Sequence, residues 1–178
     1  MPRSFDKERW LTEATDCYTR TSQHDKHRAL SKLRTDLECI DGLGRLDKWC
    51  MSQDMVIKFV SAASGMWSSE FRTVFVTTNA KPEYQLILTL HECGHMLVES
   101  YDTDEYLERY GNGYISALKL SQHSFIHRVD CLAEEFEAWH MGWDLSKKLG
   151  IELDREAFVR WRNSSLRSYI KWVTVATL

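Results

Sequence analysis

The chain has 178 residues, of which 43% are hydrophobic, and this is enough for one ordinary domain with a sizeable core. Such a composition argues against a disordered or linker-like protein. The formal net charge of −3 gives no electrostatic reason to expect nucleic acid or an anionic membrane as the general partner. We expect a single domain over 1–178, with a helical part at 1–52, a central part at 55–150 and a last helix at 154–175.

The cysteines are odd in number and widely spaced, and they form no Cys-x-x-Cys pair. This pattern favours reduced thiols over a disulfide framework or a thiolate zinc site. The first ten residues carry charges where a signal peptide would need an apolar stretch, and no apolar run reaches membrane-spanning length. We therefore expect a cytoplasmic protein without a membrane anchor. The five cysteines are Cys17, Cys39, Cys50, Cys93 and Cys131.

Apolar residues at three- and four-residue steps predict two helices at the start of the chain. The first runs from about Ser4 to Tyr18, and the second runs from Ala29 to Ile40. Asp41-Gly42-Leu43-Gly44 is typical of a helix end, so we expect the second helix to stop there. A short helical stretch should follow at 46–51.

Two segments rich in β-branched and aromatic residues predict strands at 55–60 and 72–77. The segment 61–70 between them contains Ser-Gly and is interpreted as a turn. Asn79 is a possible helix cap, and Pro82 is tolerated in a first turn, so a helix should run from there to about residue 100.

The second half of the chain is predicted to be helical. We expect residues 101–113 to be irregular or partly helical. Apolar spacing predicts a long helix over 124–149, and Gly150 should end it. Asp154 can cap a last helix that extends to Val173. Together these elements predict an α+β fold that is mostly helical, with a small two- to three-stranded sheet packed beside the helix of residues 79–100.

That helix contains the motif His91-Glu92-Cys93-Gly94-His95. Two histidines four residues apart stack on one helical face, close enough for both imidazoles to bind one metal ion, with Glu92 beside it. In hydrolases the metal lowers the pKa of a bound water, and the glutamate takes the proton of that water and passes it to the leaving group. The motif therefore predicts a metal-dependent hydrolase with His91 and His95 as ligands and Glu92 as base.

The bare string would occur by chance in about one or two chains per hundred of this composition, so its setting has to support it. Apolar residues on the same helix place the histidines at the edge of a core. Gly94 should cost about 1 kcal/mol relative to alanine inside a helix, which is reasonable if another backbone comes close there. The apolar residues are Leu86, Ile87, Leu90, Leu97 and Val98.

A catalytic zinc usually has three protein ligands and a water, so a third ligand is needed. The metzincin spacing is excluded because Tyr101 stands where its third histidine would be. We favour Glu135, because it shares a helical face with small residues that would let its helix approach Gly94 closely. A solvated acidic stripe is the simpler interpretation of this segment, and Asp130 is a candidate acceptor for a ligand histidine. The small residues are Cys131, Ala138 and Gly142, and the competing ligands are Glu134, Glu137, His123, His127 and His140.

The motif, followed by Glu135-Phe136-Glu137-Ala138, resembles the gluzincin class of zinc metallopeptidases, in which a Glu-x-x-Ala segment on a later helix supplies the third ligand. Within that class, residues 55–142 look most like the compact ImmA/IrrE-type peptidases of bacteria, phages and mobile elements. The resemblance implies a zincin-like minimal metallopeptidase fold, a zinc cofactor and peptidase activity. It implies Glu135 as the third ligand beside His91 and His95.

We therefore expect a zinc metallopeptidase that cleaves an intracellular protein or peptide, whose backbone lies against an edge strand at 72–77. The oligomeric state is not predicted. The group that stabilises the oxyanion stays open among several side chains. These are Tyr101, Tyr106, Tyr110, Tyr114 and His140.

Two other functions are compatible with the sequence. In the first, the chain is a non-enzymatic zinc-stabilised protein-binding module that acts as a regulator or antagonist, and zinc only joins two helices. A closed zinc site with four protein ligands would favour this function. In the other, the basic residues between Arg155 and Lys171 form a local nucleic-acid contact. An ordinary amphipathic helix is favoured there, because Trp161, Leu166 and Ile170 alternate with the basic residues.

Overall fold

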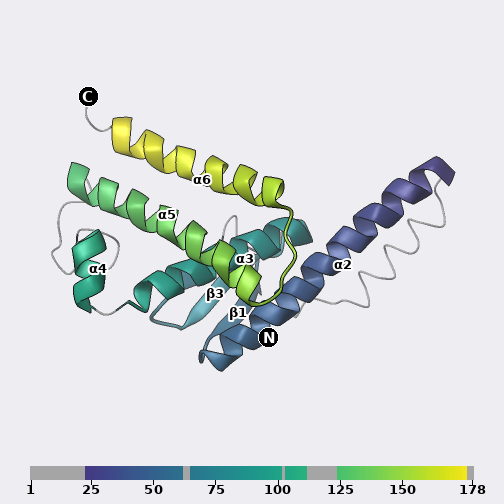
Figure 1. Cartoon of the computed structure of the whole chain (residues 1–178), viewed down its shortest axis with the longest axis horizontal. Helices are drawn as coiled ribbons and strands as arrows, with labels where there is room; N and C mark the ends of the chain where they lie inside the picture. The colour runs from purple at the N-terminus through teal and green to yellow at the C-terminus, as the bar shows by residue number, and fades with distance from the viewer. Residues whose placement is uncertain (1–22, 62–64, 102, 112–123, 176–178) are drawn as a thin grey trace. The chain divides into compact units, whose positions relative to one another are not determined.

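The computed structural model describes residues 23–61, 65–101, 103–111 and 124–175 (Figure 1). The chain divides into two compact units, Met1–Thr89 and Leu90–Leu178, which are described one after the other. The helix predicted from Ser4 to Tyr18 lies outside the described residues. The prediction of a single domain stays a prediction.

The first unit begins with one long helix, α2, over Gln23–Ser52. The predicted helix end at 41–44 is wrong, because α2 runs through it without a break. Gly42 and Leu43 are buried there, and Leu46 one turn later is fully buried. A glycine ends a helix by taking a positive φ angle, and among the described glycines only Gly150 does so. Burial of this face offsets the weak helix propensity of glycine.

The turn after α2 is held by a guanidinium from further along the chain. Asp54 takes a positive φ of 55°, and the backbone N–H of Met55 donates to the carbonyl of Cys50 at 2.9 Å. Arg72 donates from Nε to the carbonyl oxygen of Asp54 at 2.9 Å and from a terminal nitrogen to that of Gln53. The bond from Met55 satisfies a carbonyl of the last helical turn, and the two bonds from Arg72 satisfy carbonyls of the turn that follows the helix.

The three strands are β1 (Val56–Val60), β2 (Met66–Ser68) and β3 (Thr73–Thr77), and they form one sheet in the order β1-β3-β2. β1 is parallel to β3, whereas β2 is antiparallel to it. The segment 61–70, which was predicted to be a turn because its serine and glycine residues are typical of turns, thus contains strand β2. Residues 62–64 lie outside the described part of the chain. β3 is the central strand, so the predicted substrate-binding edge at 72–77 is wrong, and β1 and β2 form the edges.

Helix α3, over Pro82–Glu99, follows the sheet. Its first half belongs to the same unit and contacts the sheet: Gln85 Nε2 donates to the carbonyl of Thr77 at 2.9 Å, and Leu88 lies against Gly65. The small sheet therefore packs beside this helix, and the prediction of a mostly helical α+β fold is confirmed.

The second unit contains the rest of α3 and three further helices, α4 (Thr103–Tyr110), α5 (Phe125–Lys148) and α6 (Arg155–Val175). α4 confirms the partly helical excursion. α5 and α6 lie side by side (Figure 1). The link between them follows the predicted signals, since Gly150 takes a φ of 63° and Asp154 Oδ1 accepts the backbone N–H of Glu156 at 2.8 Å.

An aromatic cluster joins α5 to α6. The ring of Phe158 lies 5.4 Å from that of Trp139 and 5.0 Å from that of Trp143, measured between centroids. Leu166 and Val173 are buried, as predicted for an amphipathic helix, whereas Ile170 is half exposed. None of the helices in the described part of the chain combines the length and the apolar character needed to cross a membrane.

Candidate metal centre

The second half of α3 and the middle of α5 approach each other backbone to backbone. A Cβ atom at Gly94 would lie 1.9 Å from the carbonyl oxygen of Ala138, and one at Gly142 would lie 2.5 Å from that of Leu90. Real Cβ atoms do not come this close to backbone, so only glycine fits at either position. The close approach expected at Gly94 is thus confirmed, and it brings side chains of the two helices within reach of one another.

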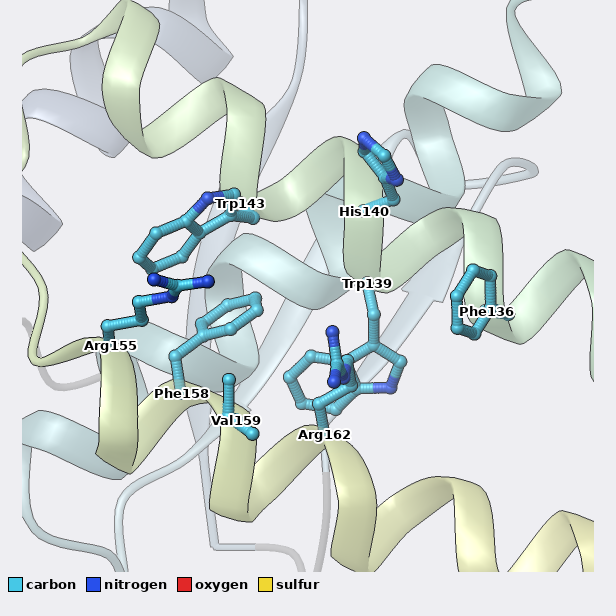
Figure 2. Close-up of a pocket in the computed structure, with 8 residues that line it drawn as sticks. All are labelled: Phe136, Trp139, His140, Trp143, Arg155, Phe158, Val159 and Arg162. Atoms are coloured by element: carbon cyan, nitrogen blue, oxygen red, sulfur yellow. The ribbon is translucent and has the colours of Figure 1, made fainter.

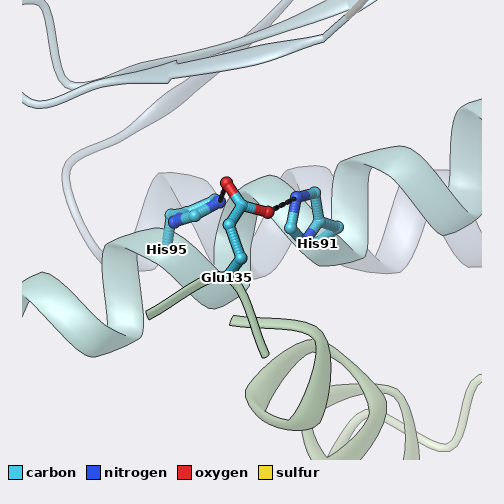
Figure 3. A group of neighbouring side chains, drawn as sticks. All are labelled: His91, His95 and Glu135. Atoms are coloured by element: carbon cyan, nitrogen blue, oxygen red, sulfur yellow. Dashed lines mark ion pairs between the residues drawn. The ribbon is translucent and has the colours of Figure 1, made fainter. Parts of the chain in front are cut away.

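This approach places the carboxylate of Glu135 between the two imidazoles of the motif, as Figure 3 shows. Glu135 Oε2 lies 3.3 Å from His91 Nε2, and Oε1 lies 3.3 Å from His95 Nε2. Two atoms bound to one tetrahedral zinc at about 2.0–2.1 Å are about 3.3–3.4 Å apart. The two histidine–glutamate distances match this value, and the ligand atoms of the three residues, all within 4.8 Å of one another, could hold a metal ion.

The charges around Glu135 favour the ionised form of its carboxyl. Burial alone would raise the pKa of the Glu135 carboxyl, but hydrogen bonds and charge from His91 and His95 hold it well below its usual range. Burial lowers the pKa of His95, yet the hydrogen bond that its imidazole donates to Glu135 and the negative charges of Glu135 and Glu92 raise it overall. A metal ion would therefore displace a proton from His95 on binding. The carboxylate is therefore ionised, which is the state a metal ion requires.

Glu92 lies beside this group and is 7% exposed. Its negative charge acts on His95, so the carboxylate is near the imidazole without being one of the three clustered ligand groups. A buried carboxylate next to a metal-binding group is in a position to accept a proton from a bound water.

His91 is oriented by stacking. Its ring lies 4.2 Å from that of Trp139 with an interplanar angle of 15°, and its Nδ1 is buried without a hydrogen bond to any described residue. Asp130 therefore does not accept a hydrogen bond from this nitrogen, and its role as an acceptor for the other ligand histidine, His95, stays a prediction. A flat aromatic surface takes over the orienting role that a carboxylate often has beside a ligand histidine.

The other candidate ligands are engaged elsewhere. The carboxylate of Glu134 accepts a hydrogen bond from Tyr106 at 2.8 Å, and His140 pairs with Asp144 at 3.2 Å on the surface. His127 contacts the Cys131 sulfur, Glu137 accepts from Tyr101 at 3.3 Å, and His123 lies outside the described residues. Within the part of the chain that the structure describes, His91, His95 and Glu135 form the one group suited to a metal ion.

One residue that contacts this group, Tyr169, was not predicted from the sequence. The hydroxyl of Tyr169, on α6, donates to Glu135 Oε1 at 2.6 Å. Of the tyrosines considered, Tyr101 and Tyr106 bind other glutamates, Tyr110 is buried against Tyr106, and Tyr114 lies outside the described residues. Tyr169 follows Phe158 by eleven residues, about three helical turns, so helical spacing could have placed it on the buried face of α6.

A cavity of about 360 Å³ lies between α5 and α6, as Figure 2 shows. Trp139 is part of its wall, and this same side chain stacks on His91. The cavity is therefore next to the metal-binding group but not part of it. It is lined by Phe136, Trp139, His140, Trp143, Arg155, Phe158, Val159 and Arg162.

No protein-family model, curated protein or solved structure matches the chain. The resemblance to gluzincins and to ImmA/IrrE-type peptidases stays a prediction. What the structure adds is the convergence of His91, His95 and Glu135.

Proposed function

We propose that the chain is a zinc-dependent hydrolase of the metallopeptidase type, which cleaves a protein or peptide in the cytoplasm. The observation that carries the proposal is the position of the Glu135 carboxylate, with each oxygen 3.3 Å from a different motif imidazole. Two histidines and one glutamate are a donor set of catalytic zinc sites, whereas structural sites usually have four ligands rich in cysteine. Cys93 and Cys131 are buried but do not belong to the group.

In this proposal each residue has a separate task. A zinc ion bound by His91, His95 and Glu135 would supply a water of lowered pKa. Glu92 would accept the proton of that water and donate it to the leaving amine. Burial of the group excludes bulk water, which strengthens the interaction of these charges with a polarised peptide carbonyl.

The alternative, a zinc-stabilised binding module, needs a fourth protein ligand. His127 and His140, which would have supplied it, contact Cys131 and Asp144 instead. These contacts favour a site with an open position and therefore favour hydrolysis over a purely structural ion.

Zinc content and cleavage of a peptide library should be measured for the wild type and for Glu92→Gln, with Glu137→Gln as a control. Glu137 lies on α5 and accepts from Tyr101, outside the metal-binding group. We expect about one zinc per chain in all three proteins, and loss of cleavage in Glu92→Gln alone, by about two orders of magnitude or more.

The three parts of the proposal fail separately. A wild type that binds no zinc would remove the metal site, and cleavage by Glu92→Gln at the wild-type rate would remove Glu92 from the mechanism. Zinc binding without cleavage of any library or cellular protein would leave the binding module as the function.

A further inference from the structure

We propose that Tyr169 is a positioning residue of the metal centre, which holds the Glu135 carboxylate in the orientation that faces both imidazoles. This inference rests on the proposed binding of a metal ion by His91, His95 and Glu135. Its basis is the hydrogen bond from the Tyr169 hydroxyl to Glu135 Oε1, at 2.6 Å between oxygens. Such a short O–H···O bond is typical of an ionised acceptor.

The carboxylate needs an external partner because a glutamate side chain has three rotatable bonds. Glu135 can bind a metal with the two histidines only in rotamers that direct its oxygens toward α3. The ring of Tyr169 has two rotatable bonds and approaches from another helix, so its hydroxyl fixes one oxygen at small entropic cost. Carboxylates that bind metals are commonly held by such hydrogen bonds, which affect affinity strongly.

Tyr169 is itself held in place by contacts between α5 and α6. Arg128, which is 2% exposed, donates from Nη1 to the carbonyl of Trp172 at 3.2 Å, one turn beyond Tyr169. At the other end of α6, Phe158 packs against Trp139, which stacks on His91. α6 therefore supports one ligand residue directly and a second through Trp139.

A neighbouring pair, Glu134 on α5 and Tyr106 on α4, provides a matched control. Glu134 is as deeply buried as Glu135 and accepts a hydrogen bond from the hydroxyl of Tyr106 at 2.8 Å. Glu134 does not belong to the metal-binding group. The same substitution, tyrosine to phenylalanine, thus removes a hydrogen bond from a tyrosine hydroxyl to a buried carboxylate in both places, but only one of the two carboxylates is a proposed ligand.

The experiment uses the full chain as wild type, Tyr169→Phe and Tyr106→Phe. Zn²⁺ affinity is measured by competition with a chromophoric chelator, and Co²⁺ is added as a spectroscopic probe of coordination geometry. Unfolding of the metal-free proteins in urea measures the structural cost of each substitution. We expect Tyr169→Phe to weaken Zn²⁺ binding by about ten- to a hundredfold and to change the Co²⁺ ligand-field bands. Both substitutions should lower the free energy of unfolding of the metal-free protein by similar amounts. Tyr106→Phe, however, should leave Zn²⁺ affinity within about threefold of the wild type.

Two results would overturn the role of Tyr169. One is wild-type affinity and an unchanged Co²⁺ spectrum in Tyr169→Phe. The other is an equal loss of affinity in both variants, since this would assign the effect to general stability. A wild type that binds neither metal would instead refute the proposed function and, with it, any positioning role. Absence of metal binding in the wild type and absence of a specific effect in Tyr169→Phe are therefore distinguishable results.

Discussion

Two adjacent glutamates on α5 are similar in burial and hydrogen bonding but face different helices. Glu134 and Glu135 are 1% and 4% exposed, and each accepts a hydrogen bond from a tyrosine. Consecutive residues on a helix point about 100° apart. Glu134 therefore faces the tyrosine of α4, whereas Glu135 faces the histidines of α3 and the tyrosine of α6. Burial and a hydrogen bond are common to both, so neither property identifies a metal ligand. The two imidazoles that converge on Glu135 distinguish it as the candidate ligand.

The largest effect should come from removing the charge of each glutamate in turn. Glu135→Gln replaces an ionised ligand by a neutral amide, so Zn²⁺ affinity should fall by about a thousandfold. Glu134→Gln keeps an acceptor for Tyr106 and should change affinity by less than about threefold. Isothermal titration with Zn²⁺ compares the two. Similar losses would mean that the site is not centred on Glu135.

The second test concerns the close approach that distinguishes the Glu135 face. Gly94→Ala would place a Cβ 1.9 Å from the Ala138 carbonyl oxygen, so the helices must separate. We expect a loss of about 3 kcal/mol in the free energy of unfolding, measured in urea. Gly44→Ala is the control, because its Cβ meets nothing within 4 Å; it should gain up to about 1 kcal/mol. Wild-type stability in Gly94→Ala would contradict the close approach.

The third test separates the stacking on His91 from the packing of α6. Trp139 and Trp143 both contact Phe158, but only Trp139 stacks on His91. Both Trp139→Leu and Trp143→Leu should lower stability. Only Trp139→Leu should weaken Zn²⁺ binding, by about two- to twelvefold, as expected for an aromatic pair worth about 0.5–1.5 kcal/mol. Equal affinity in both variants would show that stacking does not orient the imidazole.

Local chemistry made part of this structure predictable. The ends of α5 and α6 depend on Gly150 and Asp154, whose preferences act within a few residues, and both were predicted. The spacing of His91 and His95 follows from helical geometry alone. Glu135 was accessible from sequence because small residues on its face predicted a close helix contact.

Tertiary contacts explain what could not be predicted. The glycines at 42 and 44 suggested a helix end, but burial of Leu43 and Leu46 keeps α2 intact. β2 has only three residues, and its partner β3 lies beyond a turn, so no local period marks it. Tyr169 reaches Glu135 across 34 residues, and this contact depends on how α6 packs on α5. A motif shows which atoms can act, but not which side chains hold them.

The smallest effect is expected at Cys131, a possible soft donor one turn before Glu135. Burial, with the negative charges of Glu134, Asp130 and Glu135, raises the pKa of its thiol to about 12. At pH 8, four units lower, about one molecule in ten thousand carries the thiolate that binds zinc or reacts with maleimide. Cys131→Ala should leave Zn²⁺ affinity within about twofold, and mass spectrometry should find Cys131 labelled only after unfolding. Rapid labelling of the folded protein would show a thiolate on the Glu135 face, and the proposed donor set of two histidines and one glutamate would need a fourth member.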